Sequence, residues 1–308
     1  HEGAAMAAIV KDAGDDPDVT HGALIRTTVR LLPEGHGLRF KAGTGVGTVT
    51  KPGLPLPVGE PAINPGPRAM IEAALREVAD PRGFTLDLEV EVSIRDGEAL
   101  ALKTLNGRLG IVGGLSVLGT TGIVVPFSCA SWIHSIHRGI DVARAAGVAH
   151  VAGATGSTSE AAIGALDHLP EVALIDMGDF VGGMLKYLRV HPIRRVTIAG
   201  GFAKMVKLSQ GLLDLHSRAG AVDLGHLAGL AREAGADEAL AARIVGANSA
   251  LDALTVAQAR SVDLPSLVAE RAVEVAARVV RGAPIDLDVA VFDRDGGLIA
   301  RAHRPTSS

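Results

Sequence analysis

The first third of the chain has the periodicity of strands with one buried face. Apolar and charged residues alternate over residues 85–94, and the pair Asp96-Gly97 that follows is a turn signal. Shorter strands are expected at residues 4–10, 23–30 and 37–40. Apolar positions at helical spacing predict a helix over residues 69–79. Residues 1–105 are therefore predicted to form an α+β domain.

After residue 105 the pattern changes to an alternation of strands and helices. Strands are expected at residues 109–112, 149–153, 172–177 and 196–199, and helices at residues 131–146, 159–168, 180–190 and 201–213. This alternation predicts a mainly parallel sheet with helices on both faces and a ligand edge at the carboxyl ends of the strands. With a helical stretch at 224–281 and a closing hairpin at 288–302, residues 106–308 are predicted to form an α/β, Rossmann-like domain.

Residues 43–68 are rich in glycine and proline, which excludes a regular helix or a central strand. Prolines reduce the entropy lost on ordering, and glycines let the backbone approach a ligand closely. Polar side chains stand singly along the segment, at Lys51, Glu60, Asn64 and Arg68. A flexible linker is the alternative. Because a strand enters the segment and a helix follows it directly, we interpret it as a stiff binding loop.

Three predicted strand ends in the second domain run into loops of small residues: AGATGSTSE after Val151, DMGDF after Ile175 and AGGFAK after Ile198. Backbone amides at helix N-termini attract carboxylates and polarised oxygens. None of these loops matches the GxGxxG dinucleotide fingerprint. Ordinary tight turns are the alternative for each loop alone, but three on one sheet edge favour a small-molecule pocket.

A further glycine-rich stretch, residues 109–124, carries the hydroxyl groups of Ser116, Thr120 and Thr121. It suits a strand–loop passage in which the backbone meets a ligand. A glycine-rich core crossing between the domains is the alternative.

Composition narrows the classes of function. Aromatic residues make up 3% of the chain and glycines number 38, so close packing of small aliphatic residues is expected, which favours α/β architecture. The formal charge of −4 does not support nucleic-acid binding. The single cysteine, Cys129, excludes a disulfide framework and is expected to be buried. We find no membrane-span pattern and no signal peptide, and we expect a cytoplasmic protein.

An acidic loop, DAGDDPD, places Asp12, Asp15, Asp16 and Asp18 close together, with His21 after them. The spacing is not that of an EF-hand, so no metal site is predicted. Capping of backbone amides in turns is the common use of such residues. A negative pole that faces a ligand is left open.

Several long motifs resemble one family. They are VKDAGDDPDVTHG at 10–22, GTGVGTVTKPGL and VGEPAINPGPRAMI within 43–71, LGIVGGLSVLGTTGIV at 109–124, MGDFVGGML at 177–185, and GGFAKMVKL with a later LHS at 200–217. In this order, and over almost the whole chain, they are similar to the cobalt-precorrin-5B C(1)-methyltransferase family, CbiD. The resemblance implies an S5 domain 2-like fold for the first domain. It also implies a segment rich in Thr, Gly and Ala upstream of His1.

The resemblance implies methyl transfer from S-adenosylmethionine to ring carbon C(1) of cobalt-precorrin-5B, giving cobalt-precorrin-6A in corrin biosynthesis, with cobalt only as part of the substrate. A corrinoid precursor carries several carboxylates, so Lys and Arg donors are expected around it. The expected donor-binding residues are Gly153, Thr155, Gly156, Asp176, Gly178, Asp179, Gly200 and Gly201. The expected substrate-binding residues are Lys51, Glu60, Asn64, Arg68, Arg108, Ser116, Thr120, Thr121, Lys204 and Lys207. Asp16, His21, Lys51 and His216 are the candidates for catalytic roles.

The chain departs from the family pattern at two positions. Phe202 stands near a position where histidine is expected, and Asp179 stands where asparagine is more usual. A cobalt-free corrin substrate is therefore left open. Two other functions also stay open, a nucleotide-dependent corrin reductase and a non-catalytic tetrapyrrole carrier. We expect a corrinoid partner and neither nucleic acid nor membrane, and we leave open whether the protein is a homo-oligomer.

Overall fold

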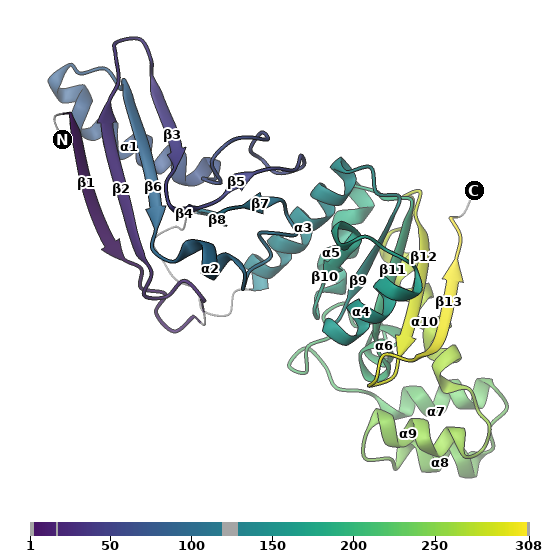
Figure 1. Cartoon of the computed structure of the whole chain (residues 1–308). Coiled ribbons are helices and arrows are strands. Elements are labelled where there is room, and N and C mark those ends of the chain that lie inside the picture. Colours follow the sequence, from purple (N-terminus) through teal and green to yellow (C-terminus); the bar gives the residue numbers. More distant parts are fainter. Residues whose placement is uncertain (1–2, 17, 119–128, 307–308) are drawn as a thin grey trace. The chain divides into compact units, whose positions relative to one another are not determined.

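The computed structural model describes residues 3–16, 18–118 and 129–306. Contacts between residues divide the chain into two compact units, His1–Trp132 and Ile133–Ser308 (Figure 1). Each unit has its own sheet and its own core. None of the described helices is long and apolar enough to cross a membrane.

The first unit contains a four-stranded sheet in the order β1-β2-β6-β3. The strands are β1 (Ala4–Val10), β2 (Leu24–Leu31), β3 (Leu38–Ala42) and β6 (Leu88–Ile94). β3 runs parallel to β6, and the other neighbours are antiparallel. The sheet confirms the predicted strands, including the alternating segment that became β6.

Helix α1 (Pro65–Ala79) supplies the apolar side chains that pack on this sheet. Ile71 and Leu75 lie against a core that includes Val90 and Val92. The helix begins four residues before the predicted start. Prolines stand in its first turn, where the missing N–H has no intrahelical partner to lose.

The binding loop is tied to the segment after residue 105 by short strands. β4 (Gly45–Val46) pairs with β8 (Gly114–Leu115), and β5 (Thr48–Val49) pairs with β7 (Ile111–Val112), with α2 (Gly97–Ala101) close by. Gly45 has a φ of +79°, and a Cβ there would lie 2.0 Å from the Ile94 carbonyl oxygen. This pairing keeps residues 106–118 with the first unit, whereas the predicted boundary lay at residue 105.

The second unit contains a five-stranded sheet in the order β10-β9-β11-β12-β13. Its strands are β9 (His150–Ala154), β10 (Leu174–Asp176), β11 (Arg195–Gly201), β12 (Asp286–Phe292) and β13 (Leu298–Arg304). β9 to β12 run parallel, and β13 is antiparallel to β12. The predicted mainly parallel sheet and closing hairpin are confirmed. The strand predicted at residues 109–112 is not part of this sheet, because β7 pairs with β5 in the first unit.

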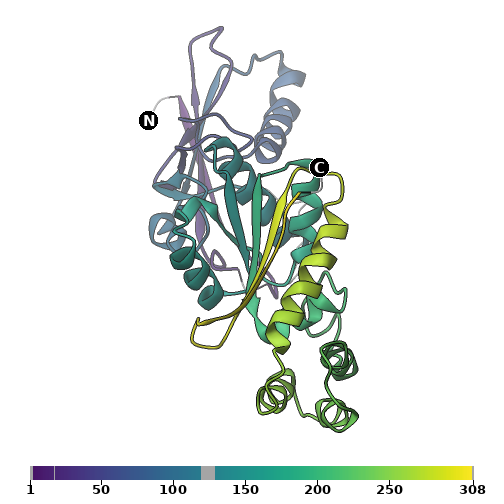
Figure 2. The same cartoon turned by 90° about the vertical axis from the view of Figure 1, so that its right-hand side faces the viewer.

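Helices surround this sheet, and a cluster of short ones lies beyond the carboxyl ends of its parallel strands (Figures 1 and 2). The helices that surround the sheet are α3 (Cys129–Ala145), α4 (Ser157–Leu166), α5 (Val181–Val190), α6 (Phe202–Ser209) and α10 (Leu264–Val279). The cluster of short helices consists of α7 (Leu224–Glu233), α8 (Glu238–Val245) and α9 (Ala250–Gln258). Single 3-10 turns occur at Asp80–Arg82 and Glu171–Ala173. The helix predicted over 201–213 ends earlier, because Gly211 takes a φ of +99°.

The two faces of the sheet are covered differently. One face presents Val151, Val196, Ile198 and similar side chains to α3, α5, α6 and α10, which together form the main core. On the other face α4 packs over alanines in the carboxyl halves of the strands. The amino-end positions of that face carry polar residues instead.

Cys129 is exposed, contrary to the prediction that it would be buried. It opens helix α3, where Trp132 is also 47% exposed. A small apolar side chain next to an aromatic residue does not by itself indicate a core position.

Candidate functional site

Arg68, a predicted substrate ligand, is held by the binding loop itself. Its Nε donates to the Ile63 carbonyl oxygen at 2.8 Å, and its Nη2 donates to Glu60 Oε2 at 2.9 Å and to the Pro61 carbonyl oxygen at 3.2 Å. The guanidinium carbon lies 5.1 Å from the centroid of the Phe40 ring. Arg68 and Glu60 therefore fix the shape of the loop.

Asn64 occupies the N-cap position of α1, and its side chain makes no cap hydrogen bond. Its backbone N–H donates to the Val117 carbonyl oxygen at 3.0 Å. The backbone is thereby anchored while the side-chain amide keeps its donors and acceptor for a ligand.

Lys51 is the cation of the loop that keeps most of its donors. A Cβ on Gly110, whose φ is +77°, would lie 2.5 Å from Lys51 Cγ, so the lysine stem rests on that glycine. Its Nζ donates to the Arg108 carbonyl oxygen at 3.4 Å. A cation placed on a rigid support with spare N–H groups is suited to a ligand carboxylate.

The glycine-rich stretch after residue 105 is organised by a buried amide. Asn106 donates through Nδ2 to the Gly114 carbonyl oxygen at 3.3 Å, and its Oδ1 accepts from Ser116 Oγ at 3.3 Å. Ser116 thus sits beside β8 with its hydroxyl hydrogen used internally. Thr120 and Thr121 lie outside the described residues.

The acidic loop is a set of turn contacts in the structure. The ammonium of Lys11 pairs with Asp18, and the Thr20 backbone N–H donates to Asp18 Oδ1 at 2.7 Å. Burial opposes ionisation of Asp18, but the Lys11 and Thr20 contacts lower its pKa overall. The backbone N–H of Asp16 donates to the Ala13 carbonyl oxygen at 3.1 Å. Among the described residues, no group of three or more potential ligands is arranged to hold a metal ion.

The two candidate histidines have similar local roles. His21 Nδ1 accepts the Ala13 backbone N–H at 3.1 Å, and His216 Nδ1 accepts the Arg218 backbone N–H at 3.1 Å. Each ring is thereby oriented, and Nε2 is the nitrogen left for a ligand. They belong to different units, and neither histidine is preferred as the catalytic candidate on its sequence context.

In the second unit, three helices begin at the carboxyl ends of neighbouring parallel strands. α4, α5 and α6 follow β9, β10 and β11, with N-cap residues Gly156, Phe180 and Gly201. No side chain caps these three starts, and a Cβ at Gly156 or Gly201 would meet nothing within 4 Å. The first amides of α4 and α6 are therefore open to a ligand, as expected for this edge.

Other predicted donor-binding positions serve packing. A Cβ at Gly153 would lie 2.3 Å from Met184 Sδ, and one at Gly200 would lie 2.8 Å from Thr155 Oγ1. Gly178 has a φ of +55° and donates its N–H to the Ala154 carbonyl oxygen at 3.1 Å. These glycines let strands and loops approach each other closely.

Two lysines and an aspartate from separate motifs meet at this edge. Lys204 Nζ pairs with the Asp179 carboxylate and also donates to the Leu215 carbonyl oxygen at 3.3 Å. Lys207 Nζ donates to the same carbonyl at 3.0 Å, and the Leu215 N–H donates to the Asp179 carbonyl oxygen at 2.9 Å. Asp176 ends strand β10 nearby in the chain, half-buried. The Leu215 carbonyl is a backbone group, so its place in this site could not be predicted from side-chain motifs.

Lys207 is unusual within this cluster, because it is only 8% exposed. Among the described residues it has no carboxylate within ion-pair distance, and its Nζ donates to the Leu215 carbonyl oxygen. An ammonium group buried without a counter-charge is costly unless something else compensates. A negatively charged ligand group would supply that compensation.

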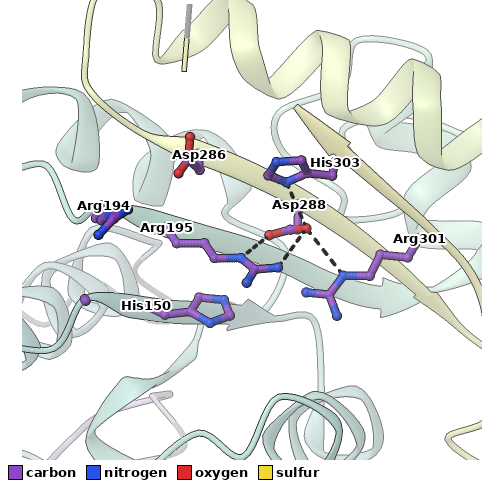
Figure 3. A pocket seen from close by; sticks show the side chains of 8 residues that line it. His150, Arg194, Arg195, Asp286, Asp288, Arg301 and His303 are labelled. Carbon is purple, nitrogen blue, oxygen red and sulfur yellow. Dashed lines mark hydrogen bonds and ion pairs between the residues drawn. The ribbon is translucent and has the colours of Figure 1, made fainter. Parts of the chain in front are cut away.

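A second polar cluster lies at the opposite, amino-terminal end of the same sheet (Figure 3). Asp288 accepts from Arg195 Nε at 2.7 Å, from Arg301 Nε at 3.4 Å and from His303 Nδ1 at 3.3 Å. Arg301 also makes two hydrogen bonds of 2.7 Å to Asp167. Sequence analysis missed this network.

The network depresses the pKa of both carboxyl groups. Burial would raise the pKa of Asp288, but the Arg195 hydrogen bond and the Arg301 and Arg195 charges hold it below its ordinary value. The paired hydrogen bonds from Arg301 lower the pKa of Asp167 against the opposing effect of burial. Both groups are therefore carboxylates at neutral pH.

Stability is expected to fall in acid because of these two groups. A carboxyl group with a depressed native pKa stabilises the fold fully above its unfolded value, about 3.9, and this contribution disappears as pH falls through the native pKa. Urea unfolding followed by circular dichroism at a series of pH values should show the free energy of unfolding decreasing below about pH 5. Asp167→Asn should be less stable at pH 7 and should lose less on acidification. An identical pH slope in wild type and variant would contradict this assignment.

Comparison with known proteins gives a consistent picture. The family model described as CbiD matches residues 1–126, and that described as the CbiD C-terminal domain matches residues 214–303. The first match includes the binding loop at residues 43–68, and the second includes Leu215.

Curated relatives are similar over nearly the whole chain. A protein of Bradyrhizobium sp. (strain BTAi1 / ATCC BAA-1182), named cobalt-precorrin-5B C(1)-methyltransferase, is 64% identical over 97% of this chain and 80% of its own length. A protein of the same name from Agrobacterium fabrum is 61% identical over 100% of this chain and 82% of its own length. A crystal structure of cobalamin biosynthesis protein CbiD from Archaeoglobus fulgidus is 26% identical, covers 66% of this chain and 62% of that chain, and gives a TM-score of 0.33.

Proposed function

The chain belongs to the CbiD family, and we propose from this that it is a cobalt-precorrin-5B C(1)-methyltransferase that uses S-adenosylmethionine. The observation that carries the proposal is the 64% identity, over 97% of the chain, to a relative of that name. The product is then cobalt-precorrin-6A, and cobalt enters only as part of the substrate.

The proposed donor site is the edge where α4, α5 and α6 begin. The uncapped backbone amides in the first turns of α4 and α6, which follow Gly156 and Gly201, suit the carboxylate of the donor's methionine part. Asp176 and Asp179 are the acceptors proposed for its amino group and ribose hydroxyls. The ion pair with Lys204 holds the Asp179 carboxylate in place. The aspartate that stands here in place of the more usual asparagine therefore has a fixed partner.

The proposed substrate site is the braced loop of the first unit. Lys51, with its spare donors, and the uncapped side chain of Asn64 are the groups proposed to contact the macrocycle. Arg68 and Glu60 position the loop. Arg108 and Ser116 stand on either side of strands β7 and β8, which pair with this loop. The fold proposed for the first unit is S5 domain 2-like.

The chemistry requires little of the protein beyond alignment. The ring carbon supplies an electron pair that forms the new bond to the methyl carbon, while the bond from that carbon to sulfur breaks and the thioether leaves. No protein nucleophile is needed. The protein contributes by orienting the two reactants, excluding water and placing charge, which are large effects in bimolecular reactions. The ring takes over the positive charge that the sulfonium loses, and release of a proton from the ring restores neutrality. His21 and His216, each with Nε2 unengaged, are the proposed acceptors of that proton. The cytoplasm is the proposed location.

Calorimetry with S-adenosylhomocysteine, and separately with a corrin precursor, tests this proposal. We expect one donor analogue to bind per chain in the wild type, and equally in Lys51→Ala. The same variant should bind the corrin precursor about tenfold more weakly, because a charge-assisted hydrogen bond is lost. Binding of NADPH in place of the analogue would indicate a reductase instead. Tight corrin binding with no affinity for the analogue would indicate a carrier.

A further inference from the structure

A pocket of about 760 Å³ opens at the amino ends of the parallel strands in the second unit (Figure 3). Its lining comes from the starts of β9, β11 and β12 and from the end of β13. The lining residues are Ala149, His150, Arg194, Arg195, Asp286, Asp288, Arg301 and His303. The volume lies within the range of about 300–1,000 Å³ that is usual for small-molecule sites.

The carboxylates of the pocket lie behind its cations. The Asp288 side chain is 2% exposed, whereas the side chains that it binds are accessible, Arg195 at 42% and His303 at 50%. Asp167, which fixes Arg301, is also largely buried. The formal charges of these groups nearly cancel, but the surface that meets solvent is mainly cationic.

Several N–H groups remain for a ligand after the internal hydrogen bonds are counted. Arg195 uses Nε and Nη2 on Asp288, which leaves Nη1. Arg194 is exposed, and no ion pair is seen for it in the described part of the chain. The remaining acid on the rim, Asp286, already accepts from the backbone N–H and hydroxyl of Thr306 at 2.8 and 2.9 Å. Arg195 stands on strand β11 and is oriented in advance by Asp288, which lowers the cost of binding, and Arg194 directly precedes the strand.

The lining defines the class of ligand. Apart from Ala149 it contains no apolar side chain, which favours a small hydrophilic ligand over a corrin macrocycle. Arginine guanidinium groups match the oxygens of phosphates and carboxylates geometrically. We propose that this pocket binds a small hydrophilic oxyanion, a phosphate group or a compact polycarboxylate.

The pocket is separate from the proposed donor site. It lies at the His150 end of β9, whereas the loop that opens α4 follows the Ala154 end. Strands rise by about 3.3 Å per residue, so the two ends of this strand are about 13 Å apart or more. The proposal concerns a second ligand and does not depend on the identity of the methyl donor.

The test uses the full chain and titrates inorganic phosphate, pyrophosphate and tricarballylate by calorimetry at low ionic strength, with glycerol as the uncharged control. Arg194→Ala removes an exposed cation, and Arg195→Lys keeps the charge beside Asp288 but removes the planar fork. The matched control is Arg243→Ala, which removes an exposed arginine of α8. Ring proton shifts of His150 and His303 in NMR spectra provide a local readout.

We expect at least one of the three anions to bind with one site per chain and to shift both histidine signals. Each pocket variant should bind it about tenfold more weakly, since charge-assisted hydrogen bonds are lost, while Arg243→Ala binds as the wild type does. The anion that binds most tightly distinguishes a phosphate from a carboxylate ligand. Saturating S-adenosylhomocysteine should leave its affinity unchanged. Absence of binding, equal binding by the pocket variants, or competition with S-adenosylhomocysteine would overturn the proposal.

Discussion

Replacing Lys207 with methionine is expected to lower kcat/KM for methyl transfer about 100-fold or more, without loss of stability. Removing one pre-oriented donor from an enclosed active site typically costs this much in rate. Lys207 is buried and donates to the Leu215 carbonyl oxygen, with no carboxylate in ion-pair distance among the described residues, so its charge is unfavourable in the ligand-free fold. Methionine keeps a long unbranched side chain in the same space and removes the charge. Activity should be measured with saturating donor, and stability by urea unfolding.

The matched control for this variant is Lys186→Met, an exposed lysine on α5. It removes the same charge from a solvated position and should change neither kcat/KM nor the free energy of unfolding. If Lys207 serves only to hold the Leu215 segment, Lys207→Met will lose stability and activity together. Unchanged turnover would remove Lys207 from the site altogether.

The fold was predictable where periodicity is strong. The alternation that became β6 and the strand–helix order of the second half both follow from which positions are apolar. Strand β7 lies within the strand predicted at residues 109–112, but it pairs in the first unit. The two-residue strands β4, β5 and β8 were not predicted, because so short a pairing shows no periodicity in the sequence. The start of α1 was missed because prolines, which usually break helices, here occupy its first turn.

The glycine-rich loops were found, but individual glycines were assigned incompletely. A glycine is required both where a ligand approaches the backbone and where a side chain of the same molecule does. Gly153 meets Met184 and Gly200 meets Thr155, whereas Gly156 and Gly201 border open space. Sequence position alone does not separate these two uses, since all four lie at strand ends.

The second polar cluster did leave a signal in the sequence. Strands β11 and β12 begin RVT and DLD, and β13 carries RAH just before its last residue, so charged or polar residues alternate with apolar ones at one end of each strand. In a parallel sheet covered on both faces, a continuous apolar run is expected. Alternation confined to one end therefore indicates a face that no helix covers there, and the structure has its pocket at that place.

Asp288→Ala is expected to lower the free energy of unfolding by about 2–3 kcal/mol at pH 7. A hydrogen bond to a charged group contributes about 1.5–3 kcal/mol, and the loss stays in this range because solvent reaches the Arg195 and His303 side chains, which are 42% and 50% exposed. Asp288 is the shared acceptor of Arg195, Arg301 and His303, so three cationic or polar groups lose a partner at once. Urea unfolding of the full chain measures the change.

The comparison that isolates the cause is with an exposed pair. Glu238→Ala removes the carboxylate partner of Arg232 on the surface, where solvent screens the charges, and should leave the unfolding midpoint nearly unchanged. Asp288→Asn, which keeps an acceptor oxygen, should fall between wild type and Asp288→Ala. If Asp288→Ala were no more harmful than Glu238→Ala, the Asp288 network would be a set of independent surface contacts. In that case the arginines of the pocket would not be oriented before a ligand arrives.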